Sequence, residues 1–339
     1  MSHGIGRKSE RPEIRRAKWV TGKIEKKFGK LKFRCLYPGC TQSGISSHSQ
    51  QKEGQLRAIA KNGLVYALDR NLFRHIKSML REEGDFLFTK KGIQEASAFA
   101  GYCSGHDQMI FAPIEKQELI PGNLSQAALF FLRAMSFEYA TKRKAAIQLD
   151  MLTDIVGKDA SSNWQEEGSA WLKGVKLFLD REGPFFLGQI FDVITKKDYK
   201  RFHISWVRVP QTLPISVTTS VCPWLNDYYT KWSPARPQAM VSFSIIPASA
   251  YTDVVCSWLD YCHEDSLWIQ REMQTPEGLE RIVNLLGIAE SEDLCISIGF
   301  WESLPEDAKH LILFNMRHDA FRGPITDVPL TVKIRQLAE

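Results

Sequence analysis

The 339-residue sequence predicts an α+β fold in two parts, a small cysteine-containing module followed by a larger mixed domain of helices and antiparallel strands. The length suits two domains, at about 100–200 residues per domain. Strand-like runs cluster between residues 185 and 246 without a regular alternation with helices, which favours antiparallel pairing. We therefore expect a flexible basic arm over 1–29, the cysteine-containing module over 30–120 and the α+β domain over 121–339.

Positive charge is concentrated in the first third of the chain. Residues 1–120 hold 22 Lys and Arg against 12 Asp and Glu, whereas residues 121–339 hold 22 against 27. The formal charges of the two parts are therefore +10 and −5, within a net charge of +5. A basic segment suits a polyanion, so we expect nucleic acid to bind through residues 1–120 by contacts to phosphates. A solvated tail without a partner is the alternative interpretation of the N-terminus.

Two classes of segment are not expected in this chain. No run approaches 18 consecutive apolar residues, so no transmembrane helix and no membrane association are expected. The N-terminal residues Met1 to Gly4 lead into a basic stretch that does not resemble a secretory signal. We therefore expect a cytoplasmic protein, in which the seven cysteines would be reduced thiols or metal ligands.

The first 120 residues predict short elements separated by turns. Leu31–Arg34 alternates apolar and charged residues, as a half-buried strand does. Leu64–Leu68 has the composition of a strand. The remaining elements expected here are a helical turn over Leu56–Ala60, a helix over Leu72–Leu80, a strand over Phe86–Phe88 and a helix from Asp107 onward.

Longer elements are expected after residue 121. Asn123 and Gln126 resemble a capping box, and apolar periodicity extends the helix that follows to about residue 150. Thr275-Pro276 is a typical cap and first-turn pair for another helix, to about Leu286. The other expected helices cover 164–179 and 305–315, and the expected strands cover 185–194, 202–209, 215–221, 240–246 and 294–300.

Two residue pairs in the first third have the spacing of metal ligands. Cys35 and Cys40 enclose Pro38-Gly39, a turn that would let both thiolates face one ion, and Cys103-x2-His106 is a second pair. Structural zinc commonly takes four nitrogen or sulfur ligands from two such pairs. A cysteine turn followed later by a pair at a helix start is the treble-clef arrangement. We therefore expect zinc on these four residues, the alternative being unrelated thiols and a surface histidine.

The order Cys35–Cys40, Ser47-His48 and Cys103–Asp107 resembles the zinc-containing HNH, or ββα-metal, endonucleases. That family has a cysteine pair, a strand ending in Asp-His or Ser-His, and a second pair at the start of a helix. The resemblance covers about residues 31–116. It implies a treble-clef module with structural zinc, and a general-base role for His48, which would take a proton from the attacking water. It also implies a second divalent ion, usually magnesium, held by Asp107 and Glu115.

Two features depart from that family pattern, and a third concerns the helix that would carry Glu115. The family often has an asparagine before its second pair, and Ala98–Tyr102 supplies none. The 55-residue interval between His48 and Cys103 requires an insertion. Pro113 is expected to bend or end the helix before Glu115. The alternative interpretation of His48 is a surface imidazole in a polar loop.

Residues 121–339 contain eight of the nine tryptophans but no recognisable catalytic motif. A Gly-rich phosphate loop, a Gly-x-Ser-x-Gly turn and a His-Glu-x-x-His helix are all missing from the sequence. This part could sense a ligand or bind a protein partner. Three hypotheses follow: a metal-dependent nuclease, a non-enzymatic zinc-finger protein that binds nucleic acid or a partner, and an enzyme whose active site lies in residues 121–339.

Overall fold

The computed structural model describes residues 12–69, 88–156, 162–224, 231, 233, 235–317 and 331–334. They form a mixture of helices and antiparallel strands, which confirms the predicted α+β class. A seven-stranded sheet has the order β3-β2-β9-β6-β7-β8-β5, and a second sheet pairs β1 with β4. The strands are β1 (Ser46–His48), β2 (Leu64–Leu68), β3 (Phe88–Gly92), β4 (Ala98–Ala100), β5 (Phe202–Val209), β6 (Ile215–Val221), β7 (Val241–Pro247), β8 (Thr252–Leu259) and β9 (Cys295–Ile296).

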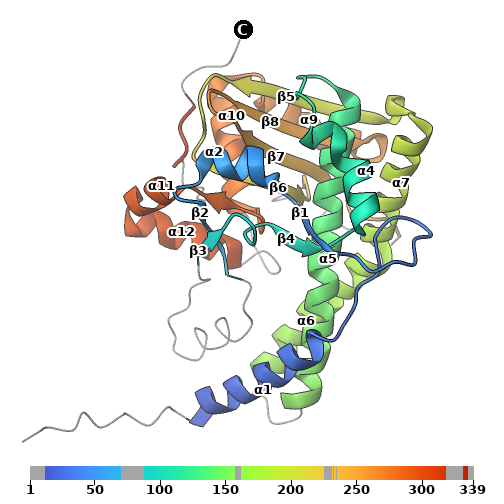
Figure 1. The fold of residues 1–339 in the computed structure, drawn as a ribbon, viewed down its shortest axis with the longest axis vertical. Helices are drawn as coiled ribbons and strands as arrows, with labels where there is room; N and C mark the ends of the chain where they lie inside the picture. Colours follow the sequence, from blue (N-terminus) through green and yellow to red (C-terminus); the bar gives the residue numbers. More distant parts are fainter. Residues whose placement is uncertain are drawn as a thin grey trace, which may run out of the picture.

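The helix α5 (Leu124–Val156) connects the large sheet with the N-terminal segments. Figure 1 shows it running from the sheet at one end to α1 at the other. Asn123 caps α5 as predicted, because its Oδ1 accepts hydrogen bonds from the backbone N–H groups of Ser125 (3.0 Å) and Gln126 (3.2 Å). The other helices and helical turns are α1 (Pro12–Phe28), η1 (Lys52–Leu56), α2 (Arg57–Ile59), α4 (Ser104–Glu115), α6 (Ser162–Leu177), η3 (Phe178–Glu182), α7 (Gly183–Lys196), η4 (Tyr199–Arg201), η6 (Asp260–Cys262), α9 (His263–Glu272), α10 (Pro276–Ile282), η7 (Val283–Ala289), α11 (Ile298–Ser303) and α12 (Glu306–Arg317).

Residues 12–28 form the helix α1, so the expectation of a flexible arm is wrong for this part of 1–29. Ile14, Ala17, Val20 and Ile24 recur at helical spacing and are each 8% exposed or less. This apolar face gives the helix a reason to order, because burying it against α5 removes it from water. The residues before 12 lie outside the described part of the chain.

The predicted boundary near residue 120 does not separate two cores. β2 and β3 belong to the expected 30–120 module, yet β2 pairs with β9 of the large sheet. Tyr102 and Phe111 share one hydrophobic core with residues of β6, β7 and β8. The segment that holds the predicted metal ligands is therefore built onto the larger domain.

Several local expectations differ from the structure. The run 185–194 is helical, because α7 begins at Gly183-Pro184 and ends where Lys197 adopts a positive φ of 55°. Only Cys295–Ile296 of the strand expected over 294–300 is extended, and α11 follows it. The strand expected over 31–34 is reduced to one bridge between Arg34 and Ser43. The helix expected over 72–80, and the first two residues of the strand expected over 86–88, lie outside the described residues.

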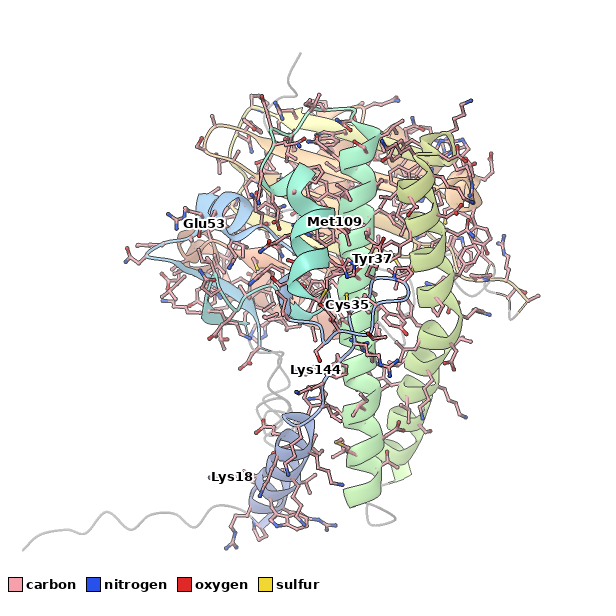
Figure 2. The ribbon with its side chains drawn as sticks, turned by 45° about the vertical axis from the view of Figure 1, so that its right-hand side comes forward. Lys18, Cys35, Tyr37, Glu53, Met109 and Lys144 are labelled. Atoms are coloured by element: carbon pink, nitrogen blue, oxygen red, sulfur yellow. The ribbon has the colours of Figure 1, made fainter. Side chains whose placement is uncertain are left out.

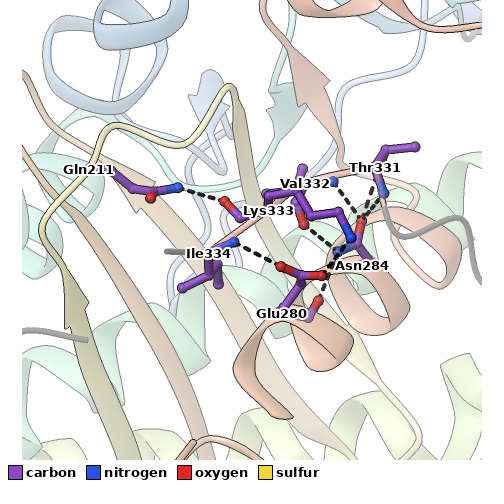
Figure 3. A network of polar contacts seen from close by, with 7 residues as sticks. All are labelled: Gln211, Glu280, Asn284, Thr331, Val332, Lys333 and Ile334. Atoms are coloured by element: carbon purple, nitrogen blue, oxygen red, sulfur yellow. Dashed lines mark hydrogen bonds and ion pairs between the residues drawn. The ribbon is translucent and has the colours of Figure 1, made fainter. Parts of the chain in front are cut away.

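A short C-terminal segment is fixed to α10 and η7 by one buried asparagine (Figure 3). The Oδ1 atom of Asn284 accepts hydrogen bonds from the backbone N–H groups of Thr331 and Val332, both at 3.0 Å, while its Nδ2 donates to Val332 O at 2.9 Å. Glu280 accepts a hydrogen bond from the N–H of Ile334 at 3.0 Å. Asn284 is fully buried, so this small network secures residues 331–334 by satisfying backbone groups.

Candidate metal centre and its neighbours

The first ligand pair lies on a tight turn between residues 35 and 40. Gly39 adopts a φ of +74°, a left-handed conformation that suits glycine, and the N–H of Cys40 donates to Tyr37 O at 3.1 Å. The N–H of Cys35 donates to Gln42 O at 2.9 Å, which closes the loop behind the turn. Both thiols therefore face the same side of the loop (Figure 2 labels Cys35 and Tyr37).

The second pair lies at the start of α4. Cys103 is the extended residue before the helix, and the N–H of Asp107 donates to its carbonyl at 2.9 Å, so His106 lies in the first turn. The two pairs are held together by backbone contact: a Cβ on Gly44 would lie 2.7 Å from the carbonyl oxygen of Gly101. A side chain at Gly44 would thus push the cysteine loop away from α4.

The four predicted ligands converge on one point. The sulfur atoms of Cys35, Cys40 and Cys103 and a ring nitrogen of His106 all lie within 4.8 Å of one another. The Nδ1 atom of His106 is 3.5 Å from the sulfur of Cys35 and 3.2 Å from that of Cys103. Ligands at about 2.0–2.3 Å around a tetrahedral ion are separated by roughly 3.3–3.8 Å, so the cluster fits a metal ion.

Neighbouring groups orient these ligands. The imidazole of His106 stacks on the ring of Tyr37, with centroids 3.9 Å apart and planes at 13°. The N–H groups of Cys103 and Tyr37 donate to the sulfur of Cys35 at 3.2 and 3.5 Å, as in sites that hold thiolates. The pKa of Cys103 is lowered chiefly by the backbone N–H of His106 at the helix start, whereas burial raises the pKa of Cys35 to about 11. A bound cation would offset that burial by stabilising the thiolate.

His48 ends β1 and pairs with Ala98 of β4. Its ring is half-buried, and Nδ1 lies 3.4 Å from the hydroxyl of Ser97. Burial lowers the pKa of His48 to about 4, with further lowering by the charges of Lys52 and Arg133 and an opposing effect of Glu115. Its imidazole is therefore neutral near pH 7.

The two predicted carboxylates lie on α4, and each interacts with a residue of β1: Asp107 with Ser47 and Glu115 with His48. Burial raises the pKa of Asp107, while a hydrogen bond with Ser47 and the charge of Arg133 act against this. Pro113 lies within α4 and does not end it before Glu115. Glu115 accepts a hydrogen bond from Arg133 at 2.5 Å and acts electrostatically on both Asp107 and His48. Within the described chain, however, these groups do not form a second cluster of three ligand atoms like that of Cys35.

Arg133 also belongs to this group, although no motif in the sequence points to it. It lies in the apolar run of α5 and is only 1% exposed. Its guanidinium stacks 4.2 Å from the ring centroid of Phe111 and pairs with Glu115. A charged residue between the apolar segments Phe130-Phe131-Leu132 and Ala134-Met135 was the available signal, because a buried arginine requires a partner.

Comparisons with known proteins do not assign the chain to a family. No protein-family model matches the chain, no curated protein matches its sequence and no solved structure matches its fold. In the part of the chain that the structure describes, no helix has both the length and the apolar character needed to cross a bilayer.

Proposed function

We propose that the chain is a metal-dependent nuclease in which zinc fills the Cys35, Cys40, Cys103 and His106 cluster and His48 is the general base. The observation that carries the proposal is the position of His48 at the end of β1, where the charge of Glu115 on α4 acts on its imidazole and the preceding residue, Ser47, hydrogen-bonds to Asp107 of α4. A turn with two cysteines, two paired strands and a helix that begins at the second ligand pair also support a treble-clef module of the ββα type.

The donor set of the cluster supports zinc as the ion. Three sulfur atoms and one nitrogen are typical of closed structural zinc sites. All four positions are taken by protein ligands, so the ion would stabilise the fold and leave no position for a substrate. The resulting rigidity would fix the start of α4, and with it Asp107, whose carboxylate hydrogen-bonds to Ser47 of β1.

In the proposed reaction, His48 takes a proton from a water molecule, whose oxygen bonds to the phosphodiester phosphorus while the ester P–O bond breaks and solvent protonates the leaving oxygen. The neutral imidazole near pH 7 suits this role. Asp107 and Glu115 would hold the divalent cation, because carboxylate oxygens and water are the ligands that magnesium prefers. Such a cation would supply positive charge to the phosphate and the leaving oxygen.

The test is cleavage of DNA and RNA by purified full-length protein, with and without added magnesium or manganese. His48→Ala should lower the cleavage rate about 100-fold or more, while the zinc content and the melting temperature stay unchanged. His203→Ala is the matched control, since His203 is a part-exposed histidine on β5 that bonds to Asp260 instead of the α4 carboxylates. If His48→Ala cleaves nucleic acid as well as the wild type or as well as His203→Ala, His48 is not the general base.

One observation favours a second candidate, a non-enzymatic zinc protein that binds nucleic acid or a protein partner. Glu115 is already engaged by the buried Arg133, which occupies a carboxylate that the catalytic ion would need. Under this hypothesis the wild-type protein binds nucleic acid but does not cleave it with any divalent ion, and His48→Ala leaves the affinity unchanged.

A further inference from the structure

A groove of about 530 Å³ lies between the C-terminal end of α1, the β1–β4 pair and α5. We call it the aromatic groove because three phenylalanines line it, together with one lysine from each of two segments. The lining residues on which the argument depends are Phe28, Lys32, Phe33, Ser46, Phe99 and Lys144.

The floor of the aromatic groove is the strand pair that carries His48. Ser46 and Ala98 both line the groove, and Ala98 is the register partner of His48. Ser46 precedes His48 by two residues, which corresponds to about 7 Å along a strand. A ligand seated in the aromatic groove would therefore lie next to the proposed general base.

The walls of the groove combine aromatic rings with cations. The rings of Phe28 and Phe33 have centroids 5.5 Å apart. The Nζ atom of Lys144, which lines the groove, lies over the ring of Phe28, 5.4 Å from its centroid. The guanidinium of Arg143, which does not line the groove, lies over the ring of Phe33, 4.5 Å from its centroid. Aromatic faces next to cations are the elements with which proteins bind unpaired bases and the phosphates that join them.

The helix α1 extends this positive surface away from the groove. Its buried face packs on α5, so the opposite face is exposed, with Trp19 55% exposed and the Nζ atom of Lys23 3.7 Å from its ring centroid. Figure 2 shows Lys144 on α5 near the end of α1 that borders the groove, and Lys18 further along α1. The exposed basic residues of α1 are Arg15, Arg16, Lys18, Lys23, Lys26 and Lys27.

We propose that the aromatic groove binds an unpaired base of single-stranded nucleic acid, while Lys32, Lys144 and the basic face of α1 contact the phosphates on either side. The proposal rests on the proposed nuclease function, for which it names the substrate class. The groove is too apolar to suit phosphates alone, since Phe28, Leu31, Phe33, Ile45 and Phe99 all line it. A paired base in a duplex would leave these rings without a stacking partner.

The test measures binding separately from cleavage. Fluorescence anisotropy of a labelled single-stranded oligonucleotide, and of the same sequence as a duplex, is recorded with zinc-loaded full-length protein in the His48→Ala background without added magnesium. Phe28→Ala and Lys32→Glu should each weaken single-strand binding about tenfold. Lys32→Glu should also make the binding constant less dependent on salt concentration, by the equivalent of about one phosphate contact or more. Phe300→Ala, on α11, and Lys200→Glu, on η4, are matched controls that should leave the affinity unchanged.

The outcomes separate the two proposals. If duplex binds more tightly than single strand, or if Lys32→Glu and Phe28→Ala behave like their controls in folded, zinc-loaded protein, the groove proposal is wrong. If the groove variants lose single-strand binding while wild-type protein cleaves nothing with any divalent ion, the nuclease proposal fails and the groove remains a binding site. Lys32 is exposed, so its substitution tests the proposal even if Phe28→Ala loosens α1.

Discussion

The depressed pKa of His48 predicts a specific pH dependence of stability. In the native protein the imidazole has a pKa of about 4, against 6.5 in the unfolded chain. The unfolded state therefore binds more protons between these values, and the free energy of unfolding rises with pH through the window. The pKa difference of about 2.5 units corresponds to about 3 kcal/mol of stability that is present above pH 6.5 and lost as the pH falls through 4.

The perturbation is His48→Gln, which keeps a polar side chain but removes the titration. Urea unfolding of both proteins, followed across the pH range at fixed zinc concentration, should give curves that converge or cross as the pH falls. From about pH 7 to pH 4.5, wild type should lose about 2 kcal/mol more than the variant. Acid also protonates the Cys35 cluster, but it does so in both proteins, so the difference between the curves isolates His48.

Two profiles that stay parallel over the whole range would refute the reasoning. They would mean that His48 is hydrated like a surface histidine and that its burial against Ser97 and Arg133 has no electrostatic cost. The same pKa predicts that any cleavage activity keeps its rate down to about pH 5, because a base with a pKa near 6.5 would lose half its active form far earlier. A cleavage midpoint near pH 6.5 would contradict the stability result.

Three further predictions concern the metal centre and the C-terminal segment. If zinc fills the cluster, Cys103→Ser should lose it and lower the melting temperature, whereas Cys256→Ser, at a buried cysteine of β8 outside the cluster, should keep it; zinc analysis of both proteins checks this. Gly39→Ala should destabilise the protein by about 1–2 kcal/mol in chemical unfolding, because alanine is strained at a φ of +74°. Asn284→Ala should cost about 2–4 kcal/mol, since it leaves the backbone groups of Val332 unsatisfied, and limited proteolysis should then release the C-terminal residues faster.

Local patterns predicted which four residues cluster but not what surrounds them. Spacing and turn residues alone pointed to Cys35, Cys40, Cys103 and His106, because two short pairs can be recognised from neighbouring positions in the sequence. The pairing of β1 with β4 could not be predicted, because each strand has only three residues and about fifty residues separate them in the sequence. The arginine that pairs with Glu115 comes from α5, and that contact depends on tertiary packing alone.

The misassigned elements have identifiable causes. The run 185–194 is apolar throughout, and such a run does not distinguish a buried strand from a buried helix. The Gly183-Pro184 start was the better signal, because proline suits a first helical turn. For α1, basic composition outweighed the apolar positions at Ile14, Ala17 and Val20, although their spacing is helical. Burial of that stripe against α5 orders a segment that charge alone would leave in solvent.

The shortness of β9 determines how this molecule should open. In the described part of the chain, the ladder between the antiparallel pair β2–β3 and β6 consists of Cys295 and Ile296 alone. Amide hydrogens of β2 and β3 should therefore exchange with solvent through a partial opening at this two-residue seam, at a free energy below that of global unfolding. Those of β6, β7 and β8, which are buried at every residue, should exchange only when the whole chain unfolds. The sheet is thus one hydrogen-bonded surface in the native state but two cooperative units in its fluctuations, and the unit that opens first is the β2–β3 pair.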